Sequence, residues 1–168
     1  MQCSLIVAVD QQGGIGKNND LMWSLPADMK FFKETTTGGV VILGRKNYES
    51  IPERFRPLPN RLNIVISRNN AYECPGAELV HSLSDAIELG TKLQPDAKQF
   101  IIGGGEIYRW ALTDDLVNEM FITHVDHTFD ADTFFPLDAM EGWNAETIAQ
   151  HEVDEKHAYA FTIKRYWK

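Results

Sequence analysis

One carboxylate in the sequence stands in surroundings that would change its chemistry. Asp28 lies close to the apolar side chains of Trp23 and Met29. Phe32 follows four residues later, and on a helix that spacing puts the acid and the aromatic ring on one face. A carboxylate held there could bind a pair of donors on a ligand or tune a proton. The alternative is an acid in the first turn of a helix, stabilised by the helix dipole and facing water.

Basic side chains gather in one segment of an otherwise acidic chain. The formal net charge is −8, yet residues 45–68 contain six basic side chains and only two acids. Most of these basic residues lie at the expected ends of strands and helices or in a Pro-rich loop, where ligands are usually held. The segment is therefore either an anion-binding site or a solvated basic face. The overall charge argues against a nucleic-acid-binding protein, which depends on clustered Lys and Arg.

Two glycine-containing segments could approach a phosphate. Gly16-Lys17 resembles part of a phosphate-binding loop, but Gln11 and Asn18 occupy the positions at which that motif has Gly and Ser or Thr. Residues 103–105 are three glycines that follow an expected strand and precede an expected helix. Amides at a helix start attract anions, and glycine lets a ligand approach the backbone, so 103–105 is the better candidate.

The remaining reactive side chains form no recognisable metal or nucleophile motif. His124 and His127 would lie on opposite faces of a strand, and their spacing matches no familiar set of metal ligands. No local motif marks a Ser-His-Asp or Cys-His arrangement. Cys3 and Cys74 indicate neither a disulfide framework nor a metal site, which favours a reducing cytoplasm. The sequence predicts neither a signal peptide nor a membrane span.

The elements that must position these residues alternate between strands and helices. Strands are predicted at 3–10, 39–43, 62–67, 79–81, 98–102, 118–126, 146–153 and 158–167. Helices are predicted at 26–36, at 44–50, from a capping sequence at 82–85 to just before Pro95, and at 106–112. The pattern predicts a single α/β domain over 1–168, with a central, mostly parallel sheet of about eight strands, an antiparallel C-terminal edge, and helices on both faces.

Ligands of such a fold bind outside the carboxyl ends of the strands. That rule brings residues 10–16, 44–45, 67–68 and 103–105 to one edge of the sheet. We expect the three prolines of 51–60 to make a rigid connector, and 126–136 to be an acidic loop.

In this order and spacing, the segments resemble the dihydrofolate reductase family over almost the whole chain. The resemblance rests on Ile6-Val7-Ala8-Val9, Gly14-Ile15-Gly16, residues 21–28, Gly44-Arg45-Lys46, residues 48–51, 56–61 and 102–108, Thr123-His124, Asp132-Thr133 and Phe135-Pro136. The family reduces 7,8-dihydrofolate to tetrahydrofolate with NADPH, a step of one-carbon metabolism. The resemblance thus implies an oxidoreductase, with dihydrofolate and NADPH as its ligands. The sequence shows no exposed aromatic cluster, so we expect a monomer.

The resemblance implies a substrate site around Asp28. Asp28 would hold the amino group and ring N3 of the pterin, Thr123 would hydrogen-bond Asp28, and Trp23 would help to hold a water. These three are the implied catalytic residues. Arg61 resembles the bidentate clamp on the glutamate carboxylate of the substrate. The implied substrate-binding residues are Ile6, Asp28, Phe32, Ile51, Leu58, Arg61 and Thr123.

The resemblance also implies an NADPH site. Arg45, Ser67 and Arg68 resemble the pocket for the 2′-phosphate, and the family has a cis peptide between two glycines that here are Gly103 and Gly104. The segment from Gly16 to Leu21 matches a mobile loop over the nicotinamide. The implied cofactor-binding residues are Ala8, Ile15, Gly16, Lys17, Asn18, Leu21, Gly44, Arg45, Lys46, Asn47, Ser67, Arg68, His81, Ile102, Gly103, Gly104, Gly105, Glu106, Ile107 and Tyr108. Two anionic ligands would account for the local positive charge.

The implied reaction transfers a hydride from nicotinamide C4 to pterin C6. Pterin N5 must then be protonated, and no residue is obviously placed to donate that proton directly. Delivery through water, with Asp28 polarising the pterin, is the mechanism that the resemblance implies.

Some positions depart from the family pattern or leave alternatives open. Met22 stands where the family usually has Pro, and Asn47 where it usually has a Thr that caps a helix, although Asn can also cap. Residues 52–55 form a longer stretch than in the shortest members of the family, which would place Arg54 and Phe55 near the glutamate tail of the substrate. Arg54 and Arg56 are alternative contacts for that tail. Rival functions are a related reductase acting on a pyrimidine intermediate of riboflavin synthesis and a non-catalytic ligand-binding module. Asp28, with Phe32 and Arg61, argues against the first rival, and no essential group is missing, which argues against the second.

Overall fold

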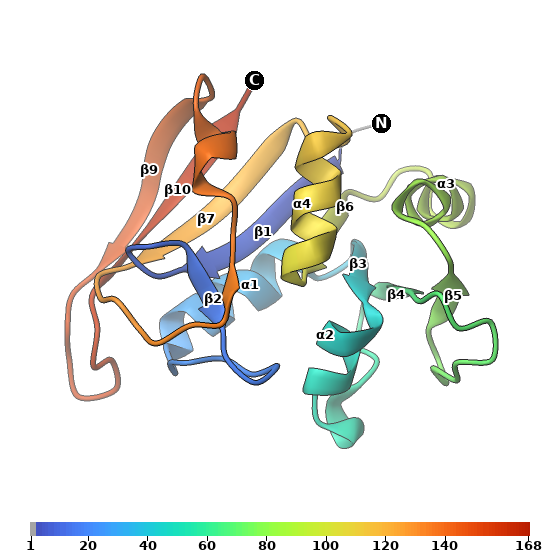
Figure 1. Ribbon diagram of the computed structural model, residues 1–168, viewed down its shortest axis with the longest axis horizontal. Helices are drawn as coiled ribbons and strands as arrows, with labels where there is room; N and C mark the ends of the chain where they lie inside the picture. Colours follow the sequence, from blue (N-terminus) through green and yellow to red (C-terminus); the bar gives the residue numbers. More distant parts are fainter. Residues whose placement is uncertain (1–2) are drawn as a thin grey trace.

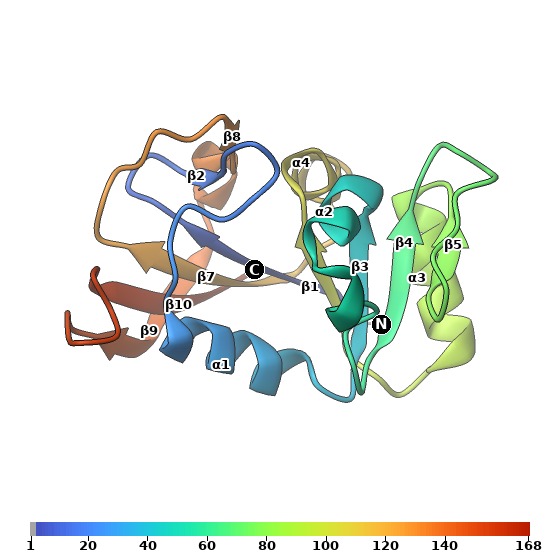
Figure 2. The same ribbon diagram turned by 90° about the horizontal axis from the view of Figure 1, so that it is seen from below.

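The computed structural model describes residues 3–168, which are organised around one eight-stranded sheet (Figures 1 and 2). Its strands are β1 (Cys3–Val9), β3 (Val40–Gly44), β4 (Leu62–Ile66), β5 (Glu78–Val80), β6 (Gln99–Gly103), β7 (Glu119–Val125), β9 (Asn144–His151) and β10 (Phe161–Trp167). Their spatial order is β5-β4-β3-β6-β1-β7-β10-β9. Neighbours from β5 to β7 are parallel, and β10 is antiparallel to both β7 and β9. The predicted parallel sheet with an antiparallel C-terminal edge is confirmed.

Helices cover both faces of the sheet, as predicted. The α-helices are α1 (Pro26–Thr36), α2 (Arg45–Ser50), α3 (Leu83–Leu93) and α4 (Gly105–Thr113). Figure 2 shows α1 on one face of the sheet and α4 on the other. Along β3, Val40 and Ile42 join the core cluster that contains residues of α3 and α4, whereas Val41 packs with Phe31 and Phe32 of α1. Successive side chains of a strand point to opposite faces, so a wholly apolar strand fills both layers.

The helix starts follow local sequence signals. The Ser82 hydroxyl accepts a hydrogen bond of 3.0 Å from the backbone N–H of Asp85, which confirms the predicted cap of α3. Pro26 occupies the start of α1, where a missing N–H costs nothing. The connector 51–60 contains the short 3₁₀ helix η1 (Glu53–Phe55), and a second one, η2 (Leu137–Met140), follows Pro136.

A small second sheet was not predicted. β2 (Gly14–Gly16) pairs antiparallel with β8 (Thr133–Phe134), so the expectation of continuous loop at 126–136 was wrong there. Gly14–Gly16 and Thr133–Phe134 contain no apolar or alternating run that would mark a strand in the sequence. Asp10 fixes the pairing, because its carboxylate accepts hydrogen bonds from the N–H of Gly14 (2.7 Å) and of Phe129 (2.9 Å).

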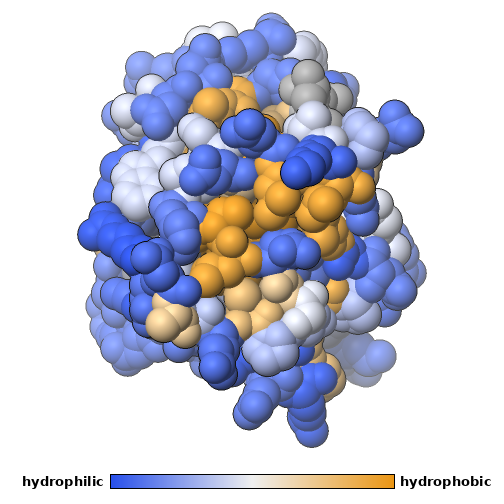
Figure 3. Space-filling view, turned by 90° about the vertical axis from the view of Figure 1, so that its right-hand side faces the viewer, coloured by the Kyte–Doolittle hydropathy of each residue, from blue (hydrophilic) through white to orange (hydrophobic). Residues whose placement is uncertain are grey.

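The sheet ends at the short strand β5 on one side. A strand of only three residues offers little backbone for pairing with another chain. Figure 3 shows the side of the molecule that carries α3 and β5, where apolar side chains form a patch among hydrophilic ones. The expectation of a monomer stays a prediction.

Neither cysteine forms a disulfide. Cys3 and Cys74 are both buried and free, and burial raises the pKa of the Cys3 thiol to about 12. Within residues 3–168, no helix is both long and apolar enough to cross a membrane.

A buried carboxylate ties the amino end of β7 to neighbouring strands. Glu119 is 3% exposed and accepts hydrogen bonds from the Ser4 hydroxyl (2.7 Å) and from Arg165 Nε (2.7 Å). It also pairs with Lys98. Burial alone would raise the pKa of Glu119, but these hydrogen bonds hold it below its ordinary value.

Replacing Glu119 with Ala should lower the free energy of unfolding by about 2–3 kcal/mol, because Lys98 and Arg165 lose the charge between them. Urea denaturation measures the change. Glu146→Ala is the matched control, since the exposed Glu146 lies 3.6 Å from the same Arg165 side chain and should contribute less than about 0.5 kcal/mol. Equal losses in the two variants would contradict a special role for the buried carboxylate.

Candidate active site

A cleft of about 1330 Å³ opens at the carboxyl ends of the parallel strands. Ile6 and Ala8 of β1 and Thr123 of β7 line it, together with residues of α1, α2 and α4. β1 lies between β6 and β7. The connection after β1 leads to β3 on the β6 side of β1, whereas the connection after β6 leads to β7 on the other side of β1. A crevice forms at such a switch point, as the sheet topology predicts.

Most of the predicted site residues meet in this cleft. Those lining it are Ile6, Ala8, Ile15, Gly16, Leu21, Trp23, Asp28, Phe32, Gly44, Arg45, Lys46, Asn47, Ile51, Leu58, Ser67, Arg68, His81, Ile102, Gly104, Gly105, Glu106, Ile107, Tyr108 and Thr123. Lys17, Asn18, Arg61 and Gly103 are not among its lining residues.

Asp28 is half-buried at the apolar end of the cleft. Its Oδ1 accepts a hydrogen bond of 2.6 Å from the Thr123 hydroxyl. Burial raises the pKa of the Asp28 carboxyl, and the hydrogen bond from Thr123 only partly offsets this. Phe32 lines the same cleft, as the four-residue spacing predicts. The alternative of a first-turn acid that merely faces water is therefore wrong.

Trp23 and the loop that precedes α1 close this end of the cleft. The Trp23 ring packs on Phe129, with ring centroids 5.1 Å apart. Nearer the tip of the loop, the Asn19 side chain donates a 2.8 Å hydrogen bond to the Lys46 carbonyl of α2. The loop thus reaches from the α1 side of the cleft to the α2 side.

The other end of the cleft is basic, and its two arginines already have acidic neighbours. Arg45 pairs with Glu49 at 2.7 Å, and Arg68 lies 3.5 Å from Glu106. His81 Nδ1 donates to the carbonyl oxygen of Ser67 at 2.8 Å. An anionic ligand could replace these exposed carboxylates as the partner of the guanidinium groups.

Of the three glycines at 103–105, Gly103 and Gly105 pack closely against neighbouring elements, whereas Gly104 has open space beside it. The peptide between Gly103 and Gly104 is cis, as the family resemblance implies. Gly103 has φ +126°, and a Cβ there would lie 3.0 Å from Asn47 Nδ2. A Cβ on Gly105 would lie 2.8 Å from Thr133 Cγ2. Glycine is thus required where this turn passes α2 and β8.

Asn47 and the arginines of the connector differ from the expectations. Asn47 donates to the Ile102 carbonyl at 3.1 Å and does not cap α2, so the expectation that it could cap was wrong. Arg56 Nη1 donates to the carbonyl oxygens at the end of α2, and the Arg54 guanidinium lies over the Phe55 ring at 4.6 Å. Neither arginine lines the cleft, whereas Phe55 does.

Arg61, Lys17 and Asn18 have partners outside the cleft. Arg61 donates to the Thr36 hydroxyl at 3.0 Å and to the Pro59 carbonyl at 2.9 Å, and burial lowers the pKa of its guanidinium.

Lys17 pairs with Asp130, and the Asn18 N–H donates to the Asp132 carboxylate at 2.9 Å. These contacts join the loop to the acidic segment that contains β8.

Several lining residues were not predicted. They are Val7, Ser24, Leu25, Met29, Phe31, Glu49, Ser50, Pro52, Ile66, Asn69, Tyr72, Trp110 and Thr133. Phe55, which the sequence placed near the substrate tail, does line the cleft and is 53% exposed. The sequence held no comparable signal for Ser24 or Asn69.

His124 and His127 contact aromatic side chains on different parts of the structure. His124 Nε2 lies 2.8 Å from the Tyr166 hydroxyl, and burial lowers the pKa of the His124 ring. Within residues 3–168, the histidines and acids close enough to share an ion are His151, Asp154 and His157, at the turn between β9 and β10.

Comparison with known proteins gives one consistent family. The sequence model described as dihydrofolate reductase matches residues 2–168. A dihydrofolate reductase of Staphylococcus haemolyticus is 36% identical over 166 residues, covering 99% of this chain and 95% of that protein. A type 3 dihydrofolate reductase of Salmonella typhimurium is 39% identical over 160 residues, covering 95% and 94%. The structure of dihydrofolate reductase from Enterococcus faecalis with NADP(H) and RAB-propyl superposes with a TM-score of 0.84 at 33% identity, covering 99% and 95%.

Asp28→Asn should stabilise the free protein at neutral pH by about 1 kcal/mol, as measured by urea denaturation across pH. The folded-state pKa of Asp28 is raised by burial, so above it the native state carries an ionised group that it disfavours. The advantage of Asn should therefore shrink as the pH falls through that pKa, and vanish below the pKa of the unfolded chain, where both states are protonated. An advantage that grew with acidity would contradict burial as the cause.

Proposed function

Because the chain belongs to the dihydrofolate reductase family, we propose that its cleft seats the pterin of dihydrofolate against Asp28 and NADPH along the basic end. The activity of this oxidoreductase is the reduction of dihydrofolate with NADP(H). The observation that carries the proposed arrangement is the hydrogen bond from Thr123 to Asp28 in an apolar end of the cleft, opposite a set of arginines.

The cofactor end fits a large anion. The lack of side chains at Gly104 and Gly105 leaves backbone exposed to the cleft at the start of α4, where amides and the helix dipole favour phosphate. Arg45, Ser67 and Arg68 would hold the 2′-phosphate by charge-assisted hydrogen bonds. The other residues named for the cofactor surround this path. When bound there, NADPH supplies the hydride that reaches pterin C6.

The substrate end fits a flat heterocycle with paired donors. A carboxylate can accept from the amino group and ring nitrogen of a pterin with two oxygens, and Thr123 engages Oδ1 from the side of β7. Ile6, Phe32, Ile51 and Leu58 would pack on the ring and its benzoyl extension. Arg61 would have to leave its contacts with Thr36 and Pro59 to hold the substrate carboxylate.

Protonation of N5 is proposed to use water. Asp28 would polarise the bound pterin, and Trp23 would help to hold the water that delivers the proton. The loop through Asn19 and Leu21 would limit the entry of bulk water while the ring is bound. We also propose that the protein acts as a monomer in the cytoplasm, in support of one-carbon metabolism.

The direct test mixes the protein with NADPH and dihydrofolate and follows the loss of reduced-nicotinamide absorbance. Steady loss that needs both ligands is the expected result. No loss, with NADPH binding retained in a titration, would favour the related reductase of pyrimidine intermediates or a non-catalytic module.

Asp28→Asn should lower kcat/KM for dihydrofolate at neutral pH by about a hundredfold or more, because the Asn amide can neither accept both pterin donors nor stabilise a protonated pterin. The defect should become smaller in acid, where free dihydrofolate is already partly protonated. The pH dependence of kcat/KM checks this, and a defect of equal size at every pH would refute the proposed role in protonation.

Arg45→Met should raise the KM for NADPH by about tenfold, and that for NADH by less than about twofold, because only NADPH carries the 2′-phosphate. Steady-state kinetics with both cofactors measures the difference. Lys92→Met, an exposed substitution at the end of α3, is the control for loss of one positive charge. Equal increases for NADPH and NADH would show that Arg45 does not read the phosphate.

A further inference from the structure

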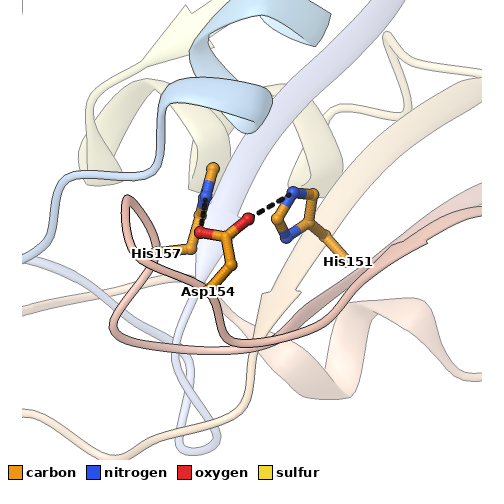
Figure 4. A group of neighbouring side chains, drawn as sticks. All are labelled: His151, Asp154 and His157. Carbon is orange, nitrogen blue, oxygen red and sulfur yellow. Dashed lines mark hydrogen bonds and ion pairs between the residues drawn. The ribbon is translucent and has the colours of Figure 1, made fainter.

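The turn between β9 and β10 presents a cluster of three side chains to the start of α1 (Figure 4). His157 Nδ1 lies 2.8 Å from Asp154 Oδ1, and His151 Nε2 lies 3.5 Å from Asp154 Oδ2. The two imidazole rings pack with centroids 4.0 Å apart. His157 is only 5% exposed. A polar side chain buried this deeply on a surface turn needs partners for both of its ring nitrogens.

The second nitrogen of His157 faces the backbone of α1. The N–H of Ala27 donates to His157 Nε2 at 3.0 Å. That atom can accept only if it carries a lone pair, so the ring is neutral and its proton is on Nδ1. Nδ1–H then donates to Asp154, and this hydrogen bond holds the pKa of Asp154 below its ordinary value. The hydrogen bonds therefore form an ordered chain from α1 to the turn.

The hydrogen bonds from Ala27 through His157 to Asp154 argue against a metal ion in the cluster. A cation bound by the three residues would take the lone pair of His157 Nδ1, the atom that already carries the proton. Moving the proton to Nε2 would set it against the N–H of Ala27, so metal binding would break the contact with α1.

The contact with His157 completes the hydrogen bonding of the first turn of α1. Pro26 has no N–H, and the N–H groups of Asp28 and Met29 both donate to the Leu25 carbonyl at 3.0 Å. No side chain of the helix start caps α1. The N–H of Ala27, one residue before Asp28, is satisfied by His157 from a turn 130 residues away. A helix end left without such a partner frays.

We propose that His157 is a positioning residue for dihydrofolate binding, which fixes the first turn of α1 and with it the Asp28 carboxylate. The inference rests on the role of Asp28 under the proposed function. Asp28 is then held from two sides, through its side chain by Thr123 of β7 and through the adjacent backbone by His157. Leu25 and Phe161, the first residue of β10, lie in one apolar cluster, so the strand that follows the turn also packs with the helix start.

Three substitutions of His157 separate its two hydrogen bonds. Gln can place its amide oxygen near the position of Nε2 and keep an acceptor for Ala27. Asn can keep a donor toward Asp154 but is too short to reach Ala27. Phe keeps a ring and removes both hydrogen bonds. Glu155→Ala, at an exposed position of the same turn, is the control for a general disturbance of the turn.

His157→Asn and His157→Phe should raise the KM for dihydrofolate about three- to tenfold, the range expected for one lost hydrogen bond, while the Kd for NADPH changes less than twofold. His157→Gln should restore most of the loss. Amide exchange by NMR should show Ala27 unprotected in the Asn and Phe variants and protected in the Gln variant. If Phe does not fold, the Asn and Gln pair carries the same comparison.

A double-mutant cycle tests whether His157 acts through Asp28. In an Asp28→Asn background, His157→Asn should add little to the loss for dihydrofolate. Full additivity of the two losses, or equal KM values for the Gln, Asn and Phe variants, would overturn the inference. Failure of the proposed function would look different, because Asp28→Asn alone would then leave the turnover of dihydrofolate unchanged.

Discussion

A half-buried carboxylate persists in a protein only where fixed donors and dipoles replace the water that it has lost, and Asp28 is such a group. Thr123 supplies a donor from the middle of the sheet, and the dipole of α1 favours a negative charge in its first turn, where Asp28 lies. The helix in turn needs the apolar contacts of Phe31 and Phe32 with the sheet. The environment of Asp28 thus depends both on the packing of α1 against the sheet and on the position of β7 beside β1.

The topology puts Asp28 and the arginines that follow β3 and β4 at opposite ends of the same cleft. The acid lies where α1 crosses near β1 and β7, and the arginines follow β3 and β4 on the other side of β6. A ligand pair that enters the cleft therefore meets opposite electrostatic environments at its two ends. Under the proposed function, this separation would let one acidic protein bind two anions and still keep an ionisable carboxyl group beside the pterin.

Sequence patterns predicted the main elements because each carries a local signal. The apolar runs of β1, β3 and β6, Pro26 at the start of α1 and the Ser82 cap of α3 are all legible within a few residues. The family resemblance named most lining residues, but their roles were not visible in the residues alone. Side-chain direction at Arg61 and Asn47 was missed, since it depends on partners distant in sequence.

The contact between His157 and Ala27 shows why some of the site could not be predicted. Its donor is a backbone N–H, which leaves no trace in residue type, and its acceptor is 130 residues away. The β2 and β8 pair was invisible for a similar reason, because its two short strands are paired only by tertiary structure. Contacts that a side chain or strand makes with the backbone of a distant segment are thus the hardest to predict from one sequence.

The shared anchor of β2 and β8 has a mechanical consequence. Asp10 holds the N–H groups of Gly14 and Phe129, and backbone pairing then ties residues 14–16 to 133–134. If the loop beside the cleft moves, residues 14–16 should therefore move together with residues 133–134, to which they are hydrogen-bonded. A Cβ on Gly14 would lie 2.7 Å from the Cβ of Ala131. Substitutions in that acidic segment would therefore alter any movement of the loop, although within 126–136 only Thr133 lines the cleft.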